Sequence, residues 1–238
     1  MKILVTGVKG QLGYDVVHEC EKRGHHVRGV DVEEMDITDM AAVSRVMKET
    51  CPDVVVHCAA WTAVDAAEDE DNISKVRAIN AGGTQNIAAV GKELGCKLIY
   101  ISTDYVFDGQ GIKPWEPDEK DYRPLNVYGQ TKLEGELAVA NTLEKYFIVR
   151  IAWVFGVNGK NFIRTMLNVG KTYDTVRVVN DQIGTPTYTY DLARLLVDMA
   201  ESEKYGYYHA TNEAGISAGT TLLVRSIVRR DIQQRLSP

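Results

Sequence analysis

The sequence has no excess of basic residues. Its 27 lysines and arginines are outnumbered by 33 aspartates and glutamates, the net charge is −6, and no basic stripe runs along the chain. Nucleic acid is therefore not an expected partner. Long apolar runs are absent too, because none approaches the ~18 residues that a membrane-spanning helix needs. A membrane is equally not an expected partner.

Cysteine is scarce and scattered. The chain has four cysteines, none of them in a C-x-x-C pair, at Cys20, Cys51, Cys58 and Cys96. This spacing is typical of free thiols in a cytoplasmic protein. The first apolar run begins at Ile3, which leaves no room for a signal peptide, so we expect a cytoplasmic location. The five histidines have no zinc-ligand spacing, so no metal site is predicted, and His57 is expected in the core.

Strand and helix patterns alternate along the first two thirds of the chain, and 45% of the residues are hydrophobic. This order predicts an α/β fold with a doubly wound, Rossmann-like parallel sheet. The predicted strands are 2–6, 26–31, 53–59, 96–102 and 147–153. The predicted helices are 11–23, 40–49, 72–94 with a break at Gly82-Gly83, and 126–143. Later helices are predicted over 162–169 and 190–201, and extended segments over 176–179 and 207–210.

Three parts are expected along the chain. Residues 1–150 are predicted to form a dinucleotide-binding domain, and 151–215 a small C-terminal substrate lobe interleaved with its core. Residues 216–238 form an atypical tail, so we expect the lobe to be incomplete.

A glycine-spaced turn follows the first predicted strand. Gly7, Gly10 and Gly13 form G-x-x-G-x-x-G ahead of a predicted helix. Glycines let backbone amides approach a pyrophosphate, and the helix N-terminus adds its positive end, although an ordinary strand–helix turn also uses glycine. Asp31 follows Gly13 by 18 residues, where a carboxylate binds a ribose 2′-hydroxyl and repels a 2′-phosphate. We therefore expect NADH as cofactor, with NADPH tolerated.

Two stretches, Ser102-Thr103-Asp104-Tyr105 and Tyr128-Gly129-Gln130-Thr131-Lys132, indicate the chemistry. Tyr128 and Lys132 share one face of a predicted helix. An ammonium beside a phenol lowers the phenol pKa from about 10, and this lysine can also hold the nicotinamide ribose. Thr103 ends a strand and can hold a carbonyl oxygen. A Y-x-x-x-K motif by itself is usually a pair of side chains on a helix surface. Here it occurs together with the Ser-Thr-Asp strand end and the glycine turn, and this combination predicts a carbonyl reductase whose proton comes from Tyr128.

The chain resembles the extended short-chain dehydrogenase/reductases. The resemblance is carried by ILVTGVKGQLG at 3–13, CAAWTAVDAAE at 58–68, STDYVFDG at 102–109, PLNVYGQTKLEGE at 124–136, RIAWVFG at 150–156 and NDQIGTPTYTYDLA at 180–193. It is similar in particular to the members that reduce the 4-keto group of dTDP-4-dehydro-L-rhamnose, with NADPH or NADH. The resemblance implies an oxidoreductase of dTDP-rhamnose biosynthesis, which supplies cell-wall polysaccharide.

By position, the resemblance also implies roles for individual residues. The implied cofactor residues are Gly7, Gly10, Gln11, Leu12, Asp31, Asp36, Ile37, Ala59, Ala60, Trp61, Thr62, Tyr128 and Lys132. The implied catalytic residues are Thr103, Tyr128 and Lys132. The implied substrate residues are Val64, Thr103, Asp104, Tyr105 and Trp153. Taken without the resemblance, Trp153 is more typical of a core aromatic at a strand end.

Some family members pair two subunits through acidic residues and a magnesium ion. Asp15 and Asp191 correspond to such acids, but Tyr190 stands where a further acid would help. This departure argues against a Mg²⁺ bridge and leaves a homodimer open. The acidic run at 68–71 is interpreted as a helix N-terminus facing solvent.

Two alternatives to the ketoreductase remain. One is an epimerase or dehydratase on the same scaffold; a dehydratase needs a glutamate beside Asp104, where this chain has Tyr105. The other is a non-catalytic binding partner, as in the methionine adenosyltransferase β subunit, which is similar to this family. The intact set of Thr103, Tyr128 and Lys132 favours chemistry.

The resemblance stops after Glu213. Codons can be chosen for residues 216–238 so that the neighbouring frame encodes LSWYDFTCEIYRQAGYTTKVIP, which is typical of the family at this position. We interpret the tail as the product of a frameshift near Gly215. Cofactor binding is then expected to survive, whereas sugar-nucleotide binding depends on the replaced segment. Source DNA without a nearby insertion or deletion would contradict this interpretation.

Overall fold

The computed structural model describes residues 1–110, 113–173, 175–179, 181–212 and 216–217. Its centre is a six-stranded parallel sheet with the strand order β2-β1-β3-β4-β5-β9. The strands are β1 (Lys2–Thr6), β2 (His26–Val30), β3 (Val54–His57), β4 (Lys97–Thr103), β5 (Tyr146–Ile151) and β9 (Gly206–His209). The predicted doubly wound sheet is thus confirmed.

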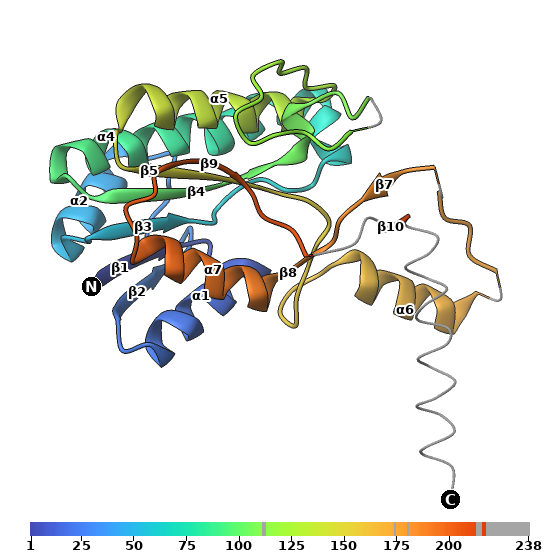
Figure 1. The fold of residues 1–238 in the computed structure, drawn as a ribbon, viewed down its shortest axis with the longest axis horizontal. Helices are drawn as coiled ribbons and strands as arrows, with labels where there is room; N and C mark the ends of the chain where they lie inside the picture. The colour runs from blue at the N-terminus through green and yellow to red at the C-terminus, as the bar shows by residue number, and fades with distance from the viewer. Residues whose placement is uncertain (111–112, 174, 180, 213–215, 218–238) are drawn as a thin grey trace, which may run out of the picture.

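Helices cover both faces of this sheet (Figure 1). One face carries α1 (Gln11–Lys22) and α7 (Thr189–Ala200), and the other carries α2 (Met40–Thr50), α4 (Thr84–Leu94) and α5 (Val127–Thr142). Strands covered on both faces must be apolar throughout, which explains why every residue of β3 is buried. Each face has its own hydrophobic cluster of strand and helix side chains.

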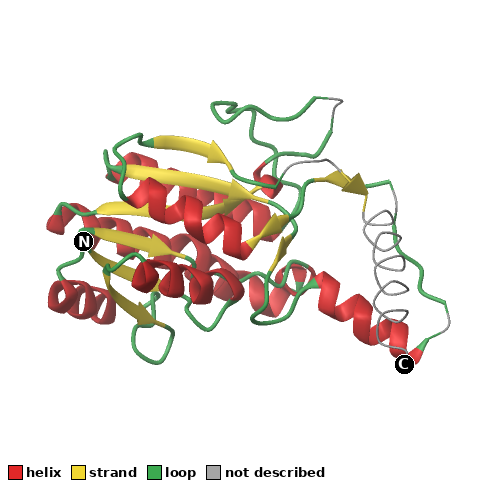
Figure 2. Cartoon of the chain, turned by 60° about the horizontal axis from the view of Figure 1, so that its bottom comes forward, coloured by secondary structure: helices red, strands yellow, loops and turns green. Residues whose placement is uncertain are grey.

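The remaining elements lie in the connections between the sheet strands and in the segment after β5. These are η1 (Asp65–Glu68), α3 (Glu70–Arg77), η2 (Ala78–Gly83), η3 (Asp104–Val106), β6 (Val154–Phe155), α6 (Phe162–Thr172), β7 (Ile183–Gly184), β8 (Thr187–Tyr188) and β10 (Ile216–Ser217). β6 pairs with β8 and β10 pairs with β7. In Figure 2, α6 and β7 project away from the sheet and its helices.

The structure departs from the predicted pattern around Gly82-Gly83 and over 176–179, and also at the end of β5. Gly82 and Gly83 do not break the helix, which continues from α3 to α4 through the π-helical turn η2. A Cβ on Gly83 would lie 2.6 Å from the Ile37 side chain, so glycine here serves close packing rather than termination. The segment 176–179 forms no strand. The tail beyond residue 217 lies outside the described residues.

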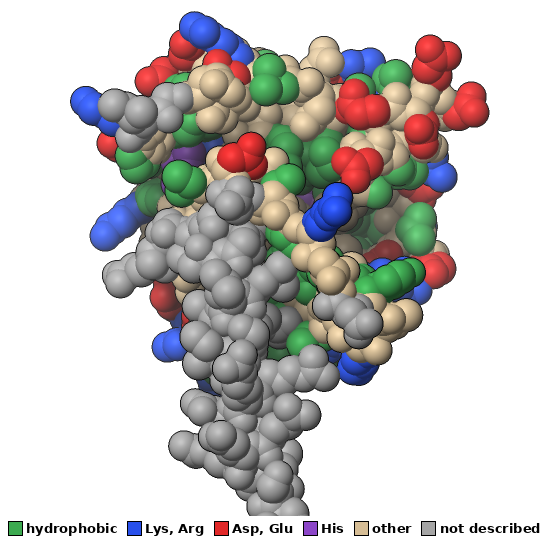
Figure 3. Space-filling model, turned by 90° about the vertical axis from the view of Figure 1, so that its right-hand side faces the viewer, with side chains coloured by type: hydrophobic (Ala, Val, Ile, Leu, Met, Phe, Trp, Pro, Cys, Tyr) green, Lys and Arg blue, Asp and Glu red, His purple; other side chains and the backbone are tan. Residues whose placement is uncertain are grey.

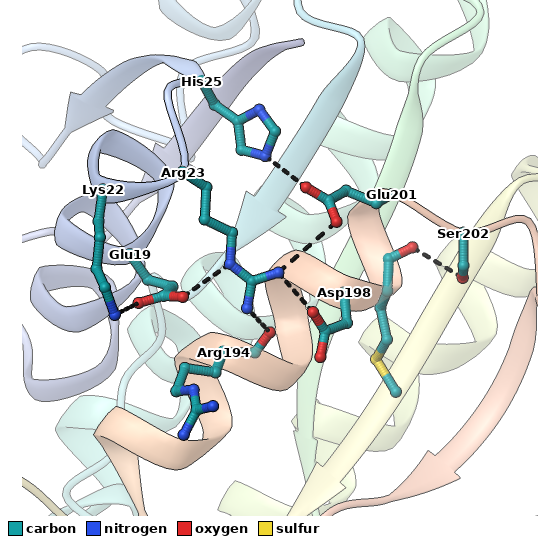
Figure 4. Close-up of polar contacts among 9 residues, drawn as sticks. Glu19, Lys22, Arg23, His25, Arg194, Asp198, Glu201 and Ser202 are labelled. Carbon is teal, nitrogen blue, oxygen red and sulfur yellow. Dashed lines mark hydrogen bonds and ion pairs between the residues drawn. The ribbon is translucent and has the colours of Figure 1, made fainter.

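Arg23 ties α1 to α7 (Figure 4). Its guanidinium donates to the Glu19 carboxylate at 2.7 Å, to the Asp198 carboxylate, and to the Arg194 carbonyl at 3.1 Å. Glu201 on the same side accepts from the His25 ring at 2.9 Å. Glu19 is buried, whereas Arg23, Asp198 and Glu201 stay partly in water, so the contacts between α1 and α7 contribute modestly to stability.

All four cysteines are free thiols. Among the described residues, no helix is both long and apolar enough to cross a bilayer. Acidic side chains gather in the upper right of the face shown in Figure 3, in line with the negative net charge of the chain.

Candidate active site

A cavity of about 1280 Å³ lies at the carboxyl ends of the parallel strands. It is lined by residues at or just beyond the ends of β1, β3, β4 and β5, including Thr6, Ala59, Thr103 and Ala152. Open parallel sheets bind ligands at this edge, because loops from both faces converge there. Every residue with a predicted role lines this cavity, with one exception, Trp61.

The glycine turn forms one wall of the cavity. Gly7 has a φ of +70°, which favours glycine, and a Cβ there would lie 2.7 Å from the Ala59 amide nitrogen. A Cβ on Gly13 would lie 2.4 Å from the Gly7 carbonyl oxygen. The turn is therefore a backbone-only surface at the N-terminus of α1. Such a cradle fits the pyrophosphate of a dinucleotide.

Asp31 places a carboxylate in the same cavity. It accepts a hydrogen bond from the Lys9 amide at 3.0 Å. The nearby cations have other partners: the Lys9 amine lies 2.6 Å from the Glu33 carboxylate, and the Arg28 guanidinium lies 3.4 Å from that of Glu49. The field at Asp31 is thus more favourable for a ribose hydroxyl than for a phosphate.

The predicted cofactor residues reach the cavity from the segments that follow β1, β2 and β3 and from helix α5. Those that line it are Gly7, Gly10, Gln11, Leu12, Asp31, Asp36, Ile37, Ala59, Ala60, Thr62, Tyr128 and Lys132. The predicted substrate residues Val64, Thr103, Asp104, Tyr105 and Trp153 also line it.

Trp61 is not among the residues that line the cavity, although its neighbours Ala60 and Thr62 are, and its contact with the cofactor stays a prediction. Its amide donates to Asn80 Oδ1 at 2.8 Å, and its indole Nε1 donates to the Ala63 carbonyl at 3.1 Å. The Lys75 ammonium lies 5.6 Å from the ring centroid. These contacts hold the indole within its own loop, which the sequence motif does not reveal.

Thr103 lies at the end of β4. Its hydroxyl donates to the Asp104 carboxylate at 3.0 Å and accepts from the Tyr105 amide at 3.2 Å. Burial raises the pKa of Asp104, although the bond from Thr103 opposes this. The Thr103 hydroxyl is therefore held in the cavity by its own strand end.

Tyr128 and Lys132 project from the first turns of α5 into the cavity. The Lys132 ammonium donates to the Ile101 carbonyl at 2.7 Å and lies 4.1 Å from the centroid of the Tyr100 ring. The rings of Tyr128 and Tyr105 meet edge to face at 5.8 Å. Asn126 caps this helix by accepting from the Gly129 amide at 2.7 Å.

The pKa of Tyr128 is raised, whereas a lowering by the neighbouring Lys132 ammonium was predicted. Burial raises it well above the usual value, and the Thr103 hydroxyl only partly opposes that shift. Burial also lowers the pKa of Lys132 to about 7, which weakens the ammonium charge that was expected to stabilise tyrosinate. Desolvation therefore dominates over charge pairing here, and Tyr128 keeps its proton at neutral pH.

His57 lies beneath the site in the core, as predicted. Its ring nitrogens lie 2.8 Å from Thr6 Oγ1 and 3.1 Å from Thr84 Oγ1. Burial, followed by the Lys132 charge, lowers the pKa of His57 to about 3, so the ring is neutral at physiological pH. The Thr6 hydroxyl also accepts from the Ala59 amide at 3.1 Å, which supports the strand end above it.

Sequence reasoning missed the turn at 156–161, which lies against the glycine turn. Asn161 Nδ2 donates to the Gln11 side chain at 2.9 Å, and Asn158 Nδ2 donates to the Gly10 carbonyl at 3.2 Å. Asn161 also caps α6 through its other side-chain atom. The available signal was Asn161 directly ahead of the predicted helix, since Asn is a preferred N-cap residue.

Trp153 has a left-handed backbone, with a φ of +46° that is rare outside glycine. A Cβ on Gly184 would lie 2.9 Å from its indole, so the ring packs directly on β7. The strand prediction through residue 153 is therefore too long, because β5 ends at Ile151. The bend aims the indole at the cavity instead of the core.

Comparison with known proteins identifies the family. A family model described as RmlD substrate binding domain matches residues 1–229. A dTDP-4-dehydrorhamnose reductase of Streptomyces griseus is 43% identical over 218 residues, covering 89% of this chain and 71% of the relative. The chain belongs to the dTDP-4-dehydrorhamnose reductase family. Its predicted membership is thereby confirmed.

Solved structures of the dTDP-4-dehydrorhamnose reductase family have the same fold. One from Clostridium acetobutylicum matches with a TM-score of 0.87 and 43% identity, covering 91% of this chain and 76% of that one. One from Bacillus anthracis, solved in complex with NADP, matches with a TM-score of 0.87 and 38% identity, covering 90% and 76%.

The two acids considered for a magnesium bridge differ in their contacts: Asp15 Oδ2 is buried without a hydrogen-bond partner among the described residues, whereas Asp191 is paired. The Asp191 carboxylate accepts from Asn212 Nδ2 at 3.0 Å. Within the part of the chain that the structure describes, no group of three or more His, Cys, Asp or Glu residues is arranged for a metal ion.

The lowered pKa of Lys132 predicts a pH-dependent stability for this reductase-family chain. The unfolded lysine holds its proton up to about pH 10.4, so above pH 7 the unfolded state binds more protons than the native state, and stability rises with pH. Relative to Lys132→Met, we expect the unfolding free energy of the cofactor-free protein to rise between pH 7 and 8.5, by up to about 1.4 kcal/mol per pH unit.

Urea unfolding at several pH values measures this difference. Ionisation of the unfolded cysteine thiols acts in the opposite direction near pH 8.5, but the same cysteines are present in both proteins, so this effect cancels in the difference. A difference between the two proteins that stays constant with pH would contradict the assigned burial of Lys132.

Proposed function

We propose that this chain is an NAD(P)H-dependent ketoreductase that reduces the 4-keto group of dTDP-4-dehydro-L-rhamnose to the alcohol of dTDP-L-rhamnose. The observation that carries the proposal is the convergence of Thr103, Tyr128 and Lys132 with a glycine-turn cradle in one cavity. Membership of the dTDP-4-dehydrorhamnose reductase family supports the substrate class. The relative solved with NADP supports the cofactor class.

In the proposed reaction, Tyr128 is the proton donor. Its burial keeps the phenol protonated at neutral pH, so a proton is available for the oxygen of the reduced carbonyl. Thr103 holds that oxygen beside the phenol when its hydroxyl turns from Asp104. When bound, the reduced nicotinamide supplies the hydride to the carbonyl carbon. The resulting tyrosinate regains its proton from solvent.

Lys132 has two tasks in this proposal. One of its N–H bonds is used by the Ile101 carbonyl, which leaves the others for the hydroxyls of the nicotinamide ribose. Its charge, once the ribose and tyrosinate are present, stabilises the deprotonated Tyr128. The glycine turn holds the pyrophosphate and Asp31 the adenosine ribose.

We further propose that residues 1–150 hold the cofactor and 151–215 shape the sugar side of the cavity. Trp153 supports this division, because its left-handed backbone turns an apolar ring into the cavity, where it can cover a deoxysugar. Val64 and Tyr105 line the same space from the opposite loops.

The alternatives fit less well. A dehydratase needs a second acid beside Asp104, and that position is Tyr105, whose ring packs on Tyr128. A non-catalytic partner has no need for a cavity in which a buried phenol, hydroxyl and amine converge. An epimerase would hold NAD permanently and show no net oxidation of added NADH.

The test is the oxidation of added NADH or NADPH by the purified 238-residue chain with dTDP-4-dehydro-L-rhamnose, followed by absorbance of the reduced nicotinamide. Substrate-dependent oxidation would establish the ketoreductase and show that the tail at 216–238 is compatible with turnover.

If the cofactor binds without oxidation, the same assay is repeated on a chain whose residues after Gly215 are replaced by the frame-shifted sequence LSWYDFTCEIYRQAGYTTKVIP. Activity gained by that replacement would support both the frameshift and the reductase. Its absence in both chains, with cofactor bound, would contradict the ketoreductase and favour a non-catalytic partner.

The cofactor preference depends on Asp31. A carboxylate that faces the adenosine ribose repels a 2′-phosphate, so we propose that NADH is preferred. Asp31→Asn is expected to raise the NADPH-to-NADH ratio of kcat/KM about tenfold. Glu49→Gln makes the same charge change on α2, outside the cavity lining, and is expected to leave the ratio unchanged. An unchanged ratio in Asp31→Asn would exclude Asp31 as the discriminating group.

We also propose a cytoplasmic location and a homodimer. Four free thiols support a reducing compartment. Exposed Tyr14 on α1 and exposed Tyr190 and Leu195 on α7 support a second subunit on that helix pair. Sedimentation of the purified chain decides between monomer and dimer.

A further inference from the structure

Glu68 behaves differently from the acids that follow it in the sequence. Asp69, Glu70 and Asp71 stand at the N-terminal end of α3, which is the position predicted for the whole acidic run. Glu68 instead accepts a hydrogen bond from the Val127 amide at 2.7 Å, across 59 residues of sequence. The distance is typical of a charge-assisted bond from a backbone amide to a carboxylate.

Val127 is the first residue of α5, the helix that carries Tyr128 and Lys132. The first amides of a helix have no partner within the helix, and a carboxylate there also meets the positive end of the helix dipole. Asn126 already caps the Gly129 amide, so Glu68 satisfies a second amide of the same turn. The turn that carries Tyr128 is therefore held by two side chains, one of which comes from another loop.

The loop at 59–64 lines the cavity and is followed directly by η1, whose last residue is Glu68. Asn80 makes a second tie between that loop and α5, since its side chain bonds the Trp61 peptide and Thr131 Oγ1 at 3.2 Å. The loop and the first turns of α5 are thus joined at two points on either side of Tyr128.

The start of α5 has no free space to move in. A Cβ on Gly129 would lie 2.3 Å from the Tyr105 carbonyl oxygen, so the helix is packed directly against η3. Any shift of the first turn consequently changes the position of the Tyr128 hydroxyl relative to Thr103. A misplacement of reacting groups by 1 Å can cost on the order of 10²-fold in rate.

We infer that Glu68 is a positioning residue: its carboxylate holds the Val127 amide and thereby fixes the Tyr128 hydroxyl against Thr103. The inference rests on the proposed function for its effect on rate, but not for the anchoring itself. Glu68 is exposed, as predicted, but its carboxylate bonds the first amide of α5 rather than an amide of α3.

The test compares Glu68→Ala, Glu68→Gln and Glu70→Ala. Glu68→Ala removes the acceptor, and kcat is expected to fall about tenfold while the KM for the cofactor stays within about twofold, because the glycine turn is untouched. Glu68→Gln keeps a carbonyl oxygen as acceptor and is expected to retain at least a third of kcat. Glu70→Ala removes a neighbouring exposed carboxylate of α3 and serves as the matched control.

Deuterium uptake by the peptide spanning 124–131 is measured on the same proteins. Faster uptake is expected in Glu68→Ala alone, and this readout separates the anchoring from turnover. Unchanged uptake and unchanged kcat in Glu68→Ala overturn the inference. So does a Glu68→Gln variant as impaired as Glu68→Ala, since that result would assign the effect to charge. If no variant turns over but uptake follows the expected order, the anchoring stands and the proposed function fails separately.

Discussion

Tyr128→Phe is expected to lower kcat for ketone reduction by about 10²- to 10⁴-fold, the usual contribution of a positioned general acid. The substitution removes the phenolic proton but keeps the ring that packs edge to face on Tyr105. Because the phenol does not belong to the pyrophosphate cradle, the Kd for the cofactor is expected to change by less than about threefold. Steady-state kinetics and cofactor titration on one preparation provide both numbers.

The matched control is Tyr173→Phe, which removes a hydroxyl from an exposed position at the end of α6, outside the cavity lining. It is expected to leave kcat, cofactor affinity and the melting temperature unchanged. Retention of more than a tenth of the parent kcat by Tyr128→Phe would show that another group delivers the proton. Of the described groups near the carbonyl position, Asp104 would be the next candidate, because burial raises its pKa.

Glu136→Leu is expected to destabilise the fold by about 3–5 kcal/mol, the usual cost of leaving a buried charge without its partner. Glu136 and Arg150 have side chains with no exposed surface, and two hydrogen bonds of 2.9 and 2.8 Å join them. The guanidinium also lies about 5 Å from the rings of Phe107 and Tyr207. Urea unfolding measures the loss.

The double variant Glu136→Leu/Arg150→Met tests the reason for that loss. It removes both charges together, so we expect its stability to exceed that of the single variant by at least about 2 kcal/mol. The gain is limited, since Arg150 also donates to Tyr122 Oη at 3.1 Å and to the Pro117 carbonyl at 3.3 Å. A double variant as unstable as the single one would show that these loop contacts, rather than the ion pair, dominate.

This ion pair also connects the fold to the site. Glu136 lies on α5 one turn beyond Lys132, and Arg150 lies on β5 next to the strand that carries Thr103. The ion pair therefore joins α5 to β5 of the sheet, while Glu68 bonds the first residue of α5. A substitution that breaks this ion pair is expected to act mainly on the free energy of unfolding and less on kcat.

The sequence by itself determined the features that depend on neighbours in the chain. The strand, glycine turn and helix at 2–22 and the Asn126 cap of α5 follow from local periodicity and from single residue types. Alternating strands and helices predict a parallel sheet. Such a sheet binds its ligand at the carboxyl ends of its strands, which is where the cavity lies. These features were predictable because each one is decided within a few residues.

Only the tertiary structure decided features that depend on burial or on distant partners. Tyr128 and Lys132 are four residues apart, but desolvation, not their charge pairing, sets both pKa directions. Gly83 was predicted to interrupt a helix, yet its contact with Ile37 makes it a packing position. The free energy of a buried group depends on everything that surrounds it, which no local pattern contains.

The same distinction explains Trp61 and Glu68. Both were assigned from their place in a motif, Trp61 to the cofactor and Glu68 to solvent. Contacts between separate elements add roles that the motif does not show: Asn80 on η2 holds the Trp61 peptide, and Glu68, although exposed as predicted, accepts from the Val127 amide 59 residues away. Residue type and spacing determined which chemistry this chain can perform, whereas long-range packing determined which side chains face the cavity and which hold them there.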